Sequence, residues 1–226
     1  WRNIKNFSVL FIASAFISFF LLDTLLSVRR QGRERAGGVE AMRDLKVDLV
    51  GPVYFLGVFM EGLHVSFLPQ FFQQVTQTSQ VSPALTSTLF TLFFAAFAFT
   101  LLPAGRYAET RGVKPLLVWG VVFSALGLAA MAMVTDFYVM ALLRIMCGIG
   151  QGLLFIGCQS YIVMMASSSR KTQAAAIIVF GYNCGFISGA ALGALLVTYM
   201  GTSGVFLLAA VLGMCILAYV LTMITD

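Results

Sequence analysis

Long apolar stretches, separated by short polar connections, run through the chain. Seven of them contain about 20 residues or more, the length that an α-helix needs to cross about 30 Å of hydrocarbon. Their residues do not alternate between apolar and polar at period two, which argues against a transmembrane β-barrel. The pattern predicts an all-α polytopic membrane protein with seven transmembrane helices, over Phe7–Val28, Leu49–Phe72, Ala84–Ala104, Pro115–Val134, Phe137–Met164, Thr172–Met200 and Gly204–Ile224.

The composition also indicates a membrane protein. Apolar residues make up 60% of the chain, charged residues only 10%, and phenylalanine alone contributes 21 residues. These values lie far outside the range of soluble domains. The first apolar stretch is too long for the core of a signal peptide, so we interpret it as a transmembrane helix. The chain begins with Trp1 rather than Met, and we expect processing or a longer native chain.

Lysine and arginine gather in alternate connections between the predicted helices. The other connections, residues 73–83, 135–136 and 201–203, contain neither. By the positive-inside rule the cationic connections are cytoplasmic, which places the N-terminus outside and Asp226 inside a plasma or inner membrane. Because topology accounts for the placement of the cations, the net charge of +5 does not indicate nucleic-acid binding. The cations are Arg29, Arg30, Arg33, Arg35, Arg43, Lys46, Arg106, Arg111, Lys114, Arg170 and Lys171.

This pattern divides the chain into three segments. Residues 1–28 hold a leading transmembrane helix, residues 29–48 a basic linker, and residues 49–226 a compact set of six helices. The linker carries charges of both signs and a Gly-Gly pair. We interpret it as a solvated cytoplasmic connection, with a site for lipid headgroups or a partner protein as the alternative.

The cationic stretch LLPAGRYAETRGVKPLL, residues 101–117, lies between the second and third helices of the six. It resembles the signature loop of the major facilitator superfamily, G-x-x-x-D-[RK]-x-G-[RK]-[RK], at Gly105, Glu109, Gly112 and Lys114. The chain departs from this pattern with Glu109 in place of Asp, Thr110 and Val113 in place of basic residues, and Arg111 displaced by one position.

Two further motifs of the superfamily follow in the expected order. LLRIMCGIGQG in the fourth helix is similar to R-x-x-x-G-x-G at Arg144, Gly148 and Gly150. GYNCGFISGAALG in the fifth is similar to the antiporter-associated G-x-x-x-G-P-x-x-G-G at Gly181, Gly185 and Gly189, with Phe186 and Ala190 replacing its Pro and last Gly. The resemblance covers about residues 49–226. It implies a fold of two six-helix halves, of which this chain matches the N-terminal one, so that transport requires a second half.

In the superfamily the signature loop acts as a latch whose acidic residue pairs with a neighbouring helix. The resemblance therefore implies a gating role for Gly105, Arg106, Glu109, Arg111, Gly112 and Lys114. The glycines allow two helix ends to approach, and Glu109 can pair with Arg111, Arg106 or a helix terminus. The alternative is that the cations only fix the topology, which leaves the acidic residue unexplained.

Only a few ionisable side chains fall inside the predicted helices, and each is a functional candidate because charge is costly in lipid. Glu61 lies near the middle of its helix, His64 follows at i+3 on the same face, and Arg144 lies at a similar depth. Burial and neighbouring charge change the proton affinity of a carboxyl group, and histidine titrates near neutrality. We expect Glu61 to carry a proton or bind a cation, His64 to modulate it, and Arg144 to be its counter-charge or to anchor an anionic substrate. A structural ion pair or an interhelical hydrogen bond is the alternative.

A glycine stripe recurs every four residues along one face of the fifth helix of the six, and such faces permit close packing of transmembrane helices. Its members are Gly181, Gly185, Gly189 and Gly193, and Gly148 with Gly152 forms a smaller version in the fourth helix. We interpret the phenylalanine-rich run LFTLFFAAFAF, residues 89–99, as lipid-facing and packing surface.

These features predict a secondary transporter, or half of one, that moves a small solute by alternating access coupled to protons. The lipid bilayer, the solute and a second half or other membrane subunit are the expected partners. No His or Cys cluster has metal-ligand spacing and no phosphate-binding loop follows a strand, so we expect neither an enzyme nor a cofactor. A membrane sensor with an external domain before the leading helix, or a structural subunit of a membrane complex, remains an alternative.

Overall fold

The computed structural model describes residues 38–166 and 171–224 of the chain. The predicted leading helix Phe7–Val28 lies outside the described residues. Within them all regular structure is helical, in the order α2 (Gly38–Val65), α3 (Leu68–Thr78), the 3-10 turn η1 (Pro83–Leu85), α4 (Thr86–Arg111), α5 (Lys114–Met131), α6 (Phe137–Met165) and α7 (Lys171–Met223).

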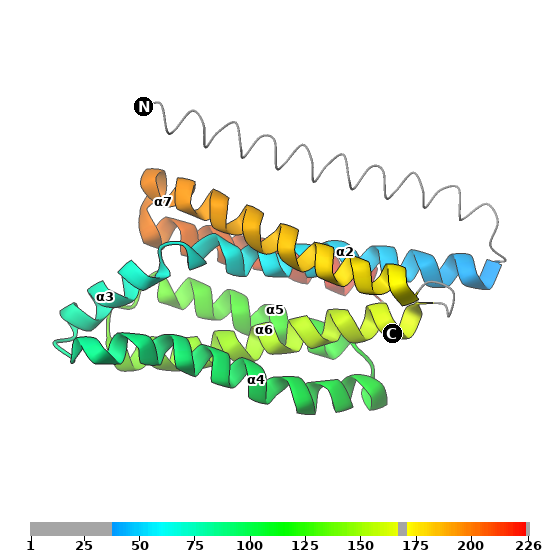
Figure 1. Ribbon diagram of the computed structural model, residues 1–226, viewed down its shortest axis with the longest axis horizontal. Helices are drawn as coiled ribbons and strands as arrows, with labels where there is room; N and C mark the ends of the chain where they lie inside the picture. Colours follow the sequence, from blue (N-terminus) through cyan, green and yellow to red (C-terminus); the bar gives the residue numbers. More distant parts are fainter. Residues whose placement is uncertain (1–37, 167–170, 225–226) are drawn as a thin grey trace.

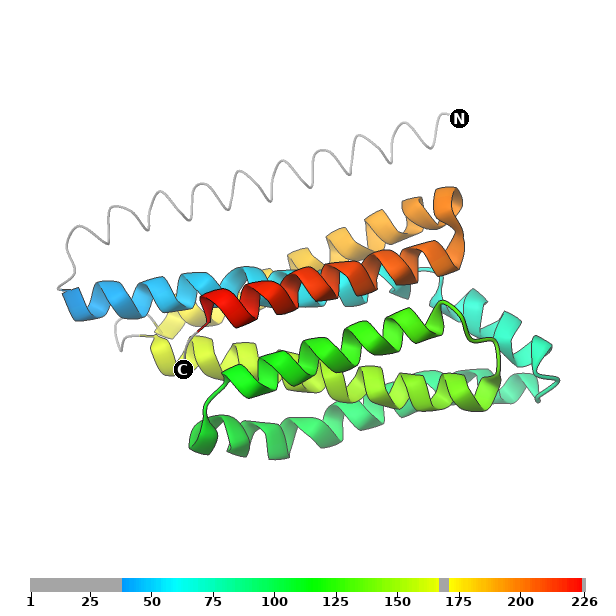
Figure 2. The same cartoon turned by 180° about the vertical axis from the view of Figure 1, so that it is seen from behind.

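The described helices have the length and composition of a multi-pass membrane protein. Four of them, α4 to α7, are long and apolar enough to cross a membrane, and α2 with α3 makes a fifth candidate if the bent pair is one span. The chain folds back within α7 at Gly201, whose φ of 71° is left-handed and suits a residue without a Cβ. Residues 171–200 and 202–223 therefore form two arms, which lie side by side in Figures 1 and 2.

The predicted span Leu49–Phe72 is wrong as a single helix. Helix α2 ends at Val65, and α3 continues at an angle of 54°. Pro69 explains the break, because a proline cannot donate to the carbonyl four residues earlier and its ring collides with that carbonyl. Its residue i−4 is Val65, the last residue of α2.

Two further boundaries differ from the prediction. Helix α2 begins at Gly38, within the predicted linker, in a segment whose sequence contains the strong helix formers Ala41, Met42 and Leu45. Helix α4 continues to Arg111, past the predicted end at Ala104, so most of the cationic stretch is helical. Polar residues thus extend both helices beyond the apolar stretch that predicted them.

Helix α6 begins at Phe137, its predicted position, because Asp136 caps it. The carboxylate Oδ1 of Asp136 accepts hydrogen bonds from the backbone N–H groups of Tyr138 and Val139, both at 3.0 Å. The cap satisfies two donors that the first turn of a helix leaves free. The capped end of α6 lies at the end of the bundle opposite Gly112.

The helices pack in two groups, α2 with α7 and α4 with α5 and α6, which meet where α5 contacts α7 and α6 contacts α2. The first arm of α7 lies on α2, while α4 and α5 both pack on α6, and α5 also contacts α7. Figure 1 is viewed onto the first arm of α7, α2, α6 and α4, whereas α5 and the second arm of α7 are nearest the viewer in Figure 2. We call the side formed by α2, α4, α6 and the first arm of α7 the four-helix face.

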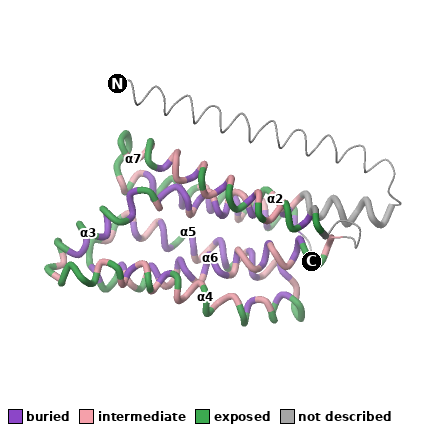
Figure 3. The backbone as a smooth tube through the Cα atoms, viewed as in Figure 1, coloured by how far each residue is buried: buried purple, intermediate pink, exposed green. Residues whose placement is uncertain are grey.

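Buried residues form two clusters, one toward each end of the bundle. The cluster nearer Gly112 includes Tyr54 and Leu117, and the cluster nearer Asp136 includes Phe72 and Phe206. In Figure 3 buried positions follow the middle of the bundle, while exposed positions are frequent along α3 and α4. The candidate ionisable residues lie in and beside the second cluster.

Candidate functional site

Glu61 and His64 form a close acid–histidine pair on α2. The distance from Glu61 Oε1 to His64 Nε2 is 3.3 Å, and the two residues are three positions apart on the helix. The Glu61 side chain is 17% exposed, whereas that of His64 has no exposed surface. The imidazole packs against Phe206, with 5.6 Å between ring centroids. Glu61 therefore links a buried histidine to the accessible surface.

Arg144 on α6 lies in the same region, enclosed by aromatic rings. It is 1% exposed, and its Cζ lies 4.1 Å from the ring centroid of Phe93 and 5.4 Å from that of Phe72. The guanidinium is close enough to Glu61 for an electrostatic interaction. Among the described residues, however, the two side chains form no ion pair within 4.0 Å.

The hydrogen-bonding capacity of Arg144 is incompletely used. Its Nε and Nη1 atoms are buried and have no hydrogen-bond partner in the described part of the chain. Cation–π contacts with two rings stabilise the charge, but they do not replace the hydrogen bonds that the N–H groups of the guanidinium would donate. Burying a guanidinium with unpaired N–H donors costs free energy unless an anion or a water molecule accepts hydrogen bonds from them. Arg144 is therefore chemically suited to bind a carboxylate.

Other polar side-chain atoms of the bundle are also buried without a partner. Both ring nitrogens of His64, Oγ of Ser124 and Nε2 of Gln151 make no hydrogen bond to described residues. Gln159, in contrast, donates from Nε2 to the hydroxyl of Tyr54 at 3.4 Å. Where the structure describes the side chains, no three His, Cys, Asp or Glu residues gather as metal ligands would.

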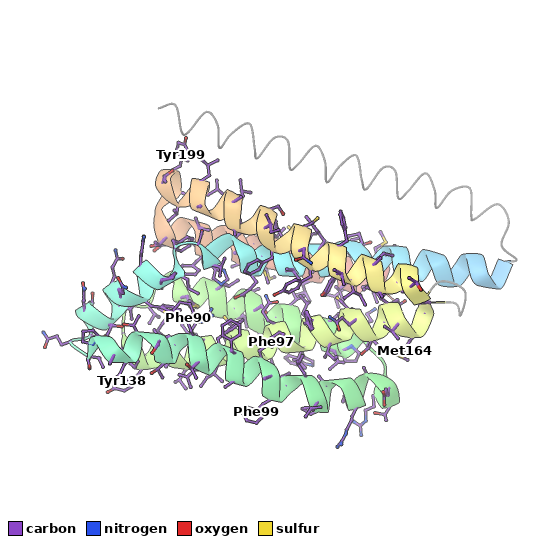
Figure 4. All side chains as sticks on the ribbon, viewed as in Figure 1. Phe90, Phe97, Phe99, Tyr138, Met164 and Tyr199 are labelled. Atoms are coloured by element: carbon purple, nitrogen blue, oxygen red, sulfur yellow. The ribbon has the colours of Figure 1, made fainter. Side chains whose placement is uncertain are left out.

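The residues that frame Arg144 were not among the predicted site residues. Phe93 belongs to the phenylalanine-rich run interpreted as lipid-facing and packing surface, yet it stacks on a buried cation. The interpretation holds for Phe99, which is 81% exposed. In Figure 4 Phe90 and Phe97 lie on the side of α4 that faces the other helices, and Phe99 lies on the opposite side. Phe93 and Phe97 are four positions apart and therefore share one face of the helix, whereas Phe99 falls on the opposite face. This helical spacing was the signal in the sequence that could have identified Phe93 as an inward-facing residue.

The glycines of the predicted stripe face α2. A Cβ added at Gly185 would lie 2.7 Å from the carbonyl oxygen of Phe55, and one at Gly193 would collide with the backbone of Leu63. Gly148 and Gly152 face α4 in the same way, against Phe93 and Thr100. The first arm of α7 and helix α2 thus touch backbone to backbone.

The residues of the predicted gating loop lie at the end of α4 and the start of α5. Gly112 adopts a φ of 88° between the helices, which favours glycine. Lys114 donates from Nζ to the carbonyl oxygen of Leu221 at 3.3 Å, and Arg111 lies 5.8 Å from the Tyr107 ring centroid. Glu109 is exposed, and across the described residues it forms no ion pair. The structure therefore does not bring Glu109 together with Arg106 or Arg111.

An open groove lies between α4, α5 and α6, separate from the acid–histidine pair. Its volume is about 690 Å³, and its lining is almost wholly apolar, with Trp119, Phe123 and Tyr107 among the aromatic residues. None of Glu61, His64 and Arg144 lines it. The groove has the character of a lipid-facing surface.

The segment that contains these residues is similar to known membrane transporters. The gallate transporter of Pseudomonas putida is 27% identical over 164 residues, which cover 72% of this chain and 36% of that protein. The chain thus spans little more than a third of the length of this relative. The sequence profile of the Major Facilitator Superfamily matches residues 50–226, a segment that contains Glu61, His64, Arg144 and both glycine groups. The chain belongs to the Major Facilitator Superfamily, a family of membrane transporters.

Proposed function

We propose that this chain forms the N-terminal half of a secondary transporter that moves a small organic carboxylate by alternating access coupled to protons. Membership of the superfamily and the multi-pass helical fold support a transport function. The relative is more than twice as long as the segment it shares with this chain, which supports a second half in the complete transporter. In this arrangement the cationic connections are cytoplasmic.

The observation that carries the proposal is the incompletely bonded guanidinium of Arg144. Its Nε and Nη1 donors are buried without a partner among the described residues. A transported carboxylate would accept both bonds and neutralise the charge. The relative is described as a gallate transporter, and gallate is a small carboxylate, which supports this substrate class.

Glu61 and His64 would carry the coupling proton. Their side chains lie 3.3 Å apart, and a proton on the imidazole converts a polar contact into an ion pair. Arg144 is within electrostatic range of Glu61, so an anion bound at Arg144 reduces the positive field that the carboxylate experiences. Substrate binding and protonation of Glu61 would thus favour each other, as symport requires.

The glycine contacts and the end of α4 would serve the conformational change. Close backbone packing lets α2 and the first arm of α7 move as one unit. Glu109 is exposed at the end of α4, available to pair with a helix of the second half. Its pairing in one conformation would make this connection a latch.

The test is uptake of labelled gallate by the full native chain in proteoliposomes, with and without an inward proton gradient. We expect gradient-driven accumulation that is abolished in Arg144→Ala and becomes independent of the gradient in Glu61→Gln. Flux that is unchanged in both variants would remove this site from the mechanism. Gallate binding without any flux would instead favour the sensor alternative.

A further inference from the structure

Five aromatic side chains meet where the four helices of the four-helix face come together. The ring of Phe155 on α6 lies 5.9 Å from Tyr54 on α2, 5.4 Å from Phe97 on α4 and 6.1 Å from Tyr182 on α7. Tyr182 in turn stacks on Phe186, with an interplanar angle of 4°. We call Tyr54, Phe97, Phe155, Tyr182 and Phe186 the aromatic cluster.

The aromatic cluster is not closed over. Tyr182 is 42% exposed, and Phe97, Phe155 and Phe186 are each only partly buried. Phe97 lies on the side of α4 that faces the bundle, as Figure 4 shows. Rings that are fully packed against one another have no π-surface left for a ligand, whereas these partly exposed rings retain some.

Polar groups border the cluster. Gln159 donates to the Tyr54 hydroxyl at 3.4 Å, and the Tyr54 hydroxyl proton has no acceptor among the residues that the structure describes. Tyr182 adds a second hydroxyl at the exposed side. An amide and two phenols beside exposed rings match the chemistry of a planar ring that carries hydroxyl groups.

The cluster is distinct from Arg144. On α6, Phe155 follows Arg144 by about three helical turns, or about 16 Å along the axis, so the two residues lie at different depths of the bundle. Ring contacts nevertheless connect them: Arg144 lies over Phe93, and Phe93 stacks 6.4 Å from Phe97, which contacts Phe155.

From this geometry we infer that the aromatic cluster is a second binding site for the substrate, and that it selects hydroxylated aromatic carboxylates by stacking their ring and bonding their hydroxyl groups. The inference rests on the proposed transport function and narrows its substrate class. Arg144 holds the carboxylate at one position of the pathway. The aromatic cluster holds the ring at another position, nearer Gly112.

Direct binding tests the inference without requiring transport. The full native chain, purified in detergent, is titrated calorimetrically with gallate, benzoate and cyclohexanecarboxylate, which has a ring of similar size without a π-system. Because Arg144 accepts any carboxylate, the titrations use Arg144→Met protein, in which only the second site remains. We expect gallate to bind more tightly than benzoate, and cyclohexanecarboxylate to bind most weakly.

Substitutions then assign the binding to the cluster. Phe155→Leu retains an apolar side chain but removes the π-surface, and we expect it to weaken gallate binding roughly threefold to tenfold. Gln159→Leu is expected to weaken gallate binding but not benzoate binding. Phe99→Leu is the matched control, since Phe99 is exposed on the opposite side of α4.

The outcomes separate the inference from the proposed function. Equal affinity for gallate and cyclohexanecarboxylate, or an equal loss of both in Phe155→Leu, overturns the aromatic site and leaves carboxylate transport through Arg144 intact. Ring-selective binding without flux in proteoliposomes supports the site and contradicts the transport proposal. If Phe155→Leu does not purify as a single species, Tyr182→Leu provides the same comparison at an exposed position.

Discussion

Glu61 Oε1 and His64 Nε2 lie 3.3 Å apart on one face of α2, and only the carboxylate has access to the surface. The histidine is fully buried and packs against the ring of Phe206. A proton that reaches the imidazole must therefore come by way of Glu61 or of a rearrangement of the surrounding helices. This order of access makes Glu61 the residue whose replacement is most informative.

Glu61→Gln is expected to uncouple transport from the proton gradient. The amide preserves the shape of the side chain but cannot bind and release a proton, so accumulation against the substrate gradient should fall at least about tenfold. Exchange of labelled for unlabelled gallate needs no net proton movement and should persist. Gradient-driven uptake and exchange, measured in parallel in proteoliposomes, distinguish these steps. Loss of both at once would indicate a binding or folding role instead.

Arg144→Met is expected to abolish gallate uptake without lowering the stability of the protein. The guanidinium is buried, and two of its nitrogens have no partner among the described residues, so its removal relieves an uncompensated burial cost. The lost cation–π contacts with Phe93 and Phe72 amount to about 1–2 kcal/mol and offset part of that gain. We therefore expect an apparent Tm within a few degrees of the wild-type value.

Arg144→Lys provides the comparison for charge. It keeps the charge but loses the planar fork, so partial uptake with a raised KM is expected. A fall in Tm of ten degrees or more in Arg144→Met would show that the arginine is structural.

The apolar pattern predicted the helices of the bundle because lipid forces each span to be long and internally hydrogen-bonded. It did not predict the break after Val65, since Phe67 to Phe72 continue the apolar character while Pro69 ends the helix. Nor did it predict the start of α2 at Gly38, where polar helix formers extend a helix beyond its apolar segment. Hydropathy identifies what lies in lipid, but local backbone chemistry decides where a helix ends.

The ionisable residues of the site were predictable because charges are rare inside transmembrane helices. Their surroundings were not, since the contact of Arg144 with Phe93 joins α6 to α4 and the contact of His64 with Phe206 joins α2 to α7. Such pairs depend on how helices that are distant in sequence pack. A run of phenylalanines indicates only that the helix is apolar.

Gly193→Ala is expected to destabilise the fold, whereas Gly51→Ala is not. A Cβ at Gly193 would collide with the backbone of Leu63, which cannot move without separating α7 from α2, while a Cβ at Gly51 meets nothing within 4 Å. Overpacking of this kind costs about 1–3 kcal/mol, whereas alanine in an open helical position gains about 0.5–1 kcal/mol. Apparent Tm values in detergent should fall by several degrees for the first variant and stay level or rise for the second. Equal effects would mean that the two helices are not in close contact.

Asp136→Ala is expected to destabilise α6 by about 1 kcal/mol, because two backbone donors lose their acceptor. Asp136→Asn retains an oxygen that can accept both bonds and serves as the matched variant. Thermal unfolding should rank the proteins as wild type, then asparagine, then alanine. If alanine and asparagine behave alike, the carboxylate acts through its charge on the helix terminus and not through the cap.

Glu109→Gln tests whether the end of α4 gates transport. Glu109 is exposed and forms no ion pair with any described residue, so its loss should leave the apparent Tm unchanged. A latch that pairs with the second half in only one conformation would nevertheless shift the balance between conformations, and we expect the rate of exchange to change severalfold at constant substrate affinity. Thr110→Val is the matched control, because among the described residues the Thr110 hydroxyl bonds only to the backbone of its own helix, at Arg106 and Tyr107. If the exchange rate of Glu109→Gln equals that of the wild type, the end of α4 does not gate transport, and the surrounding cations serve only to fix the topology.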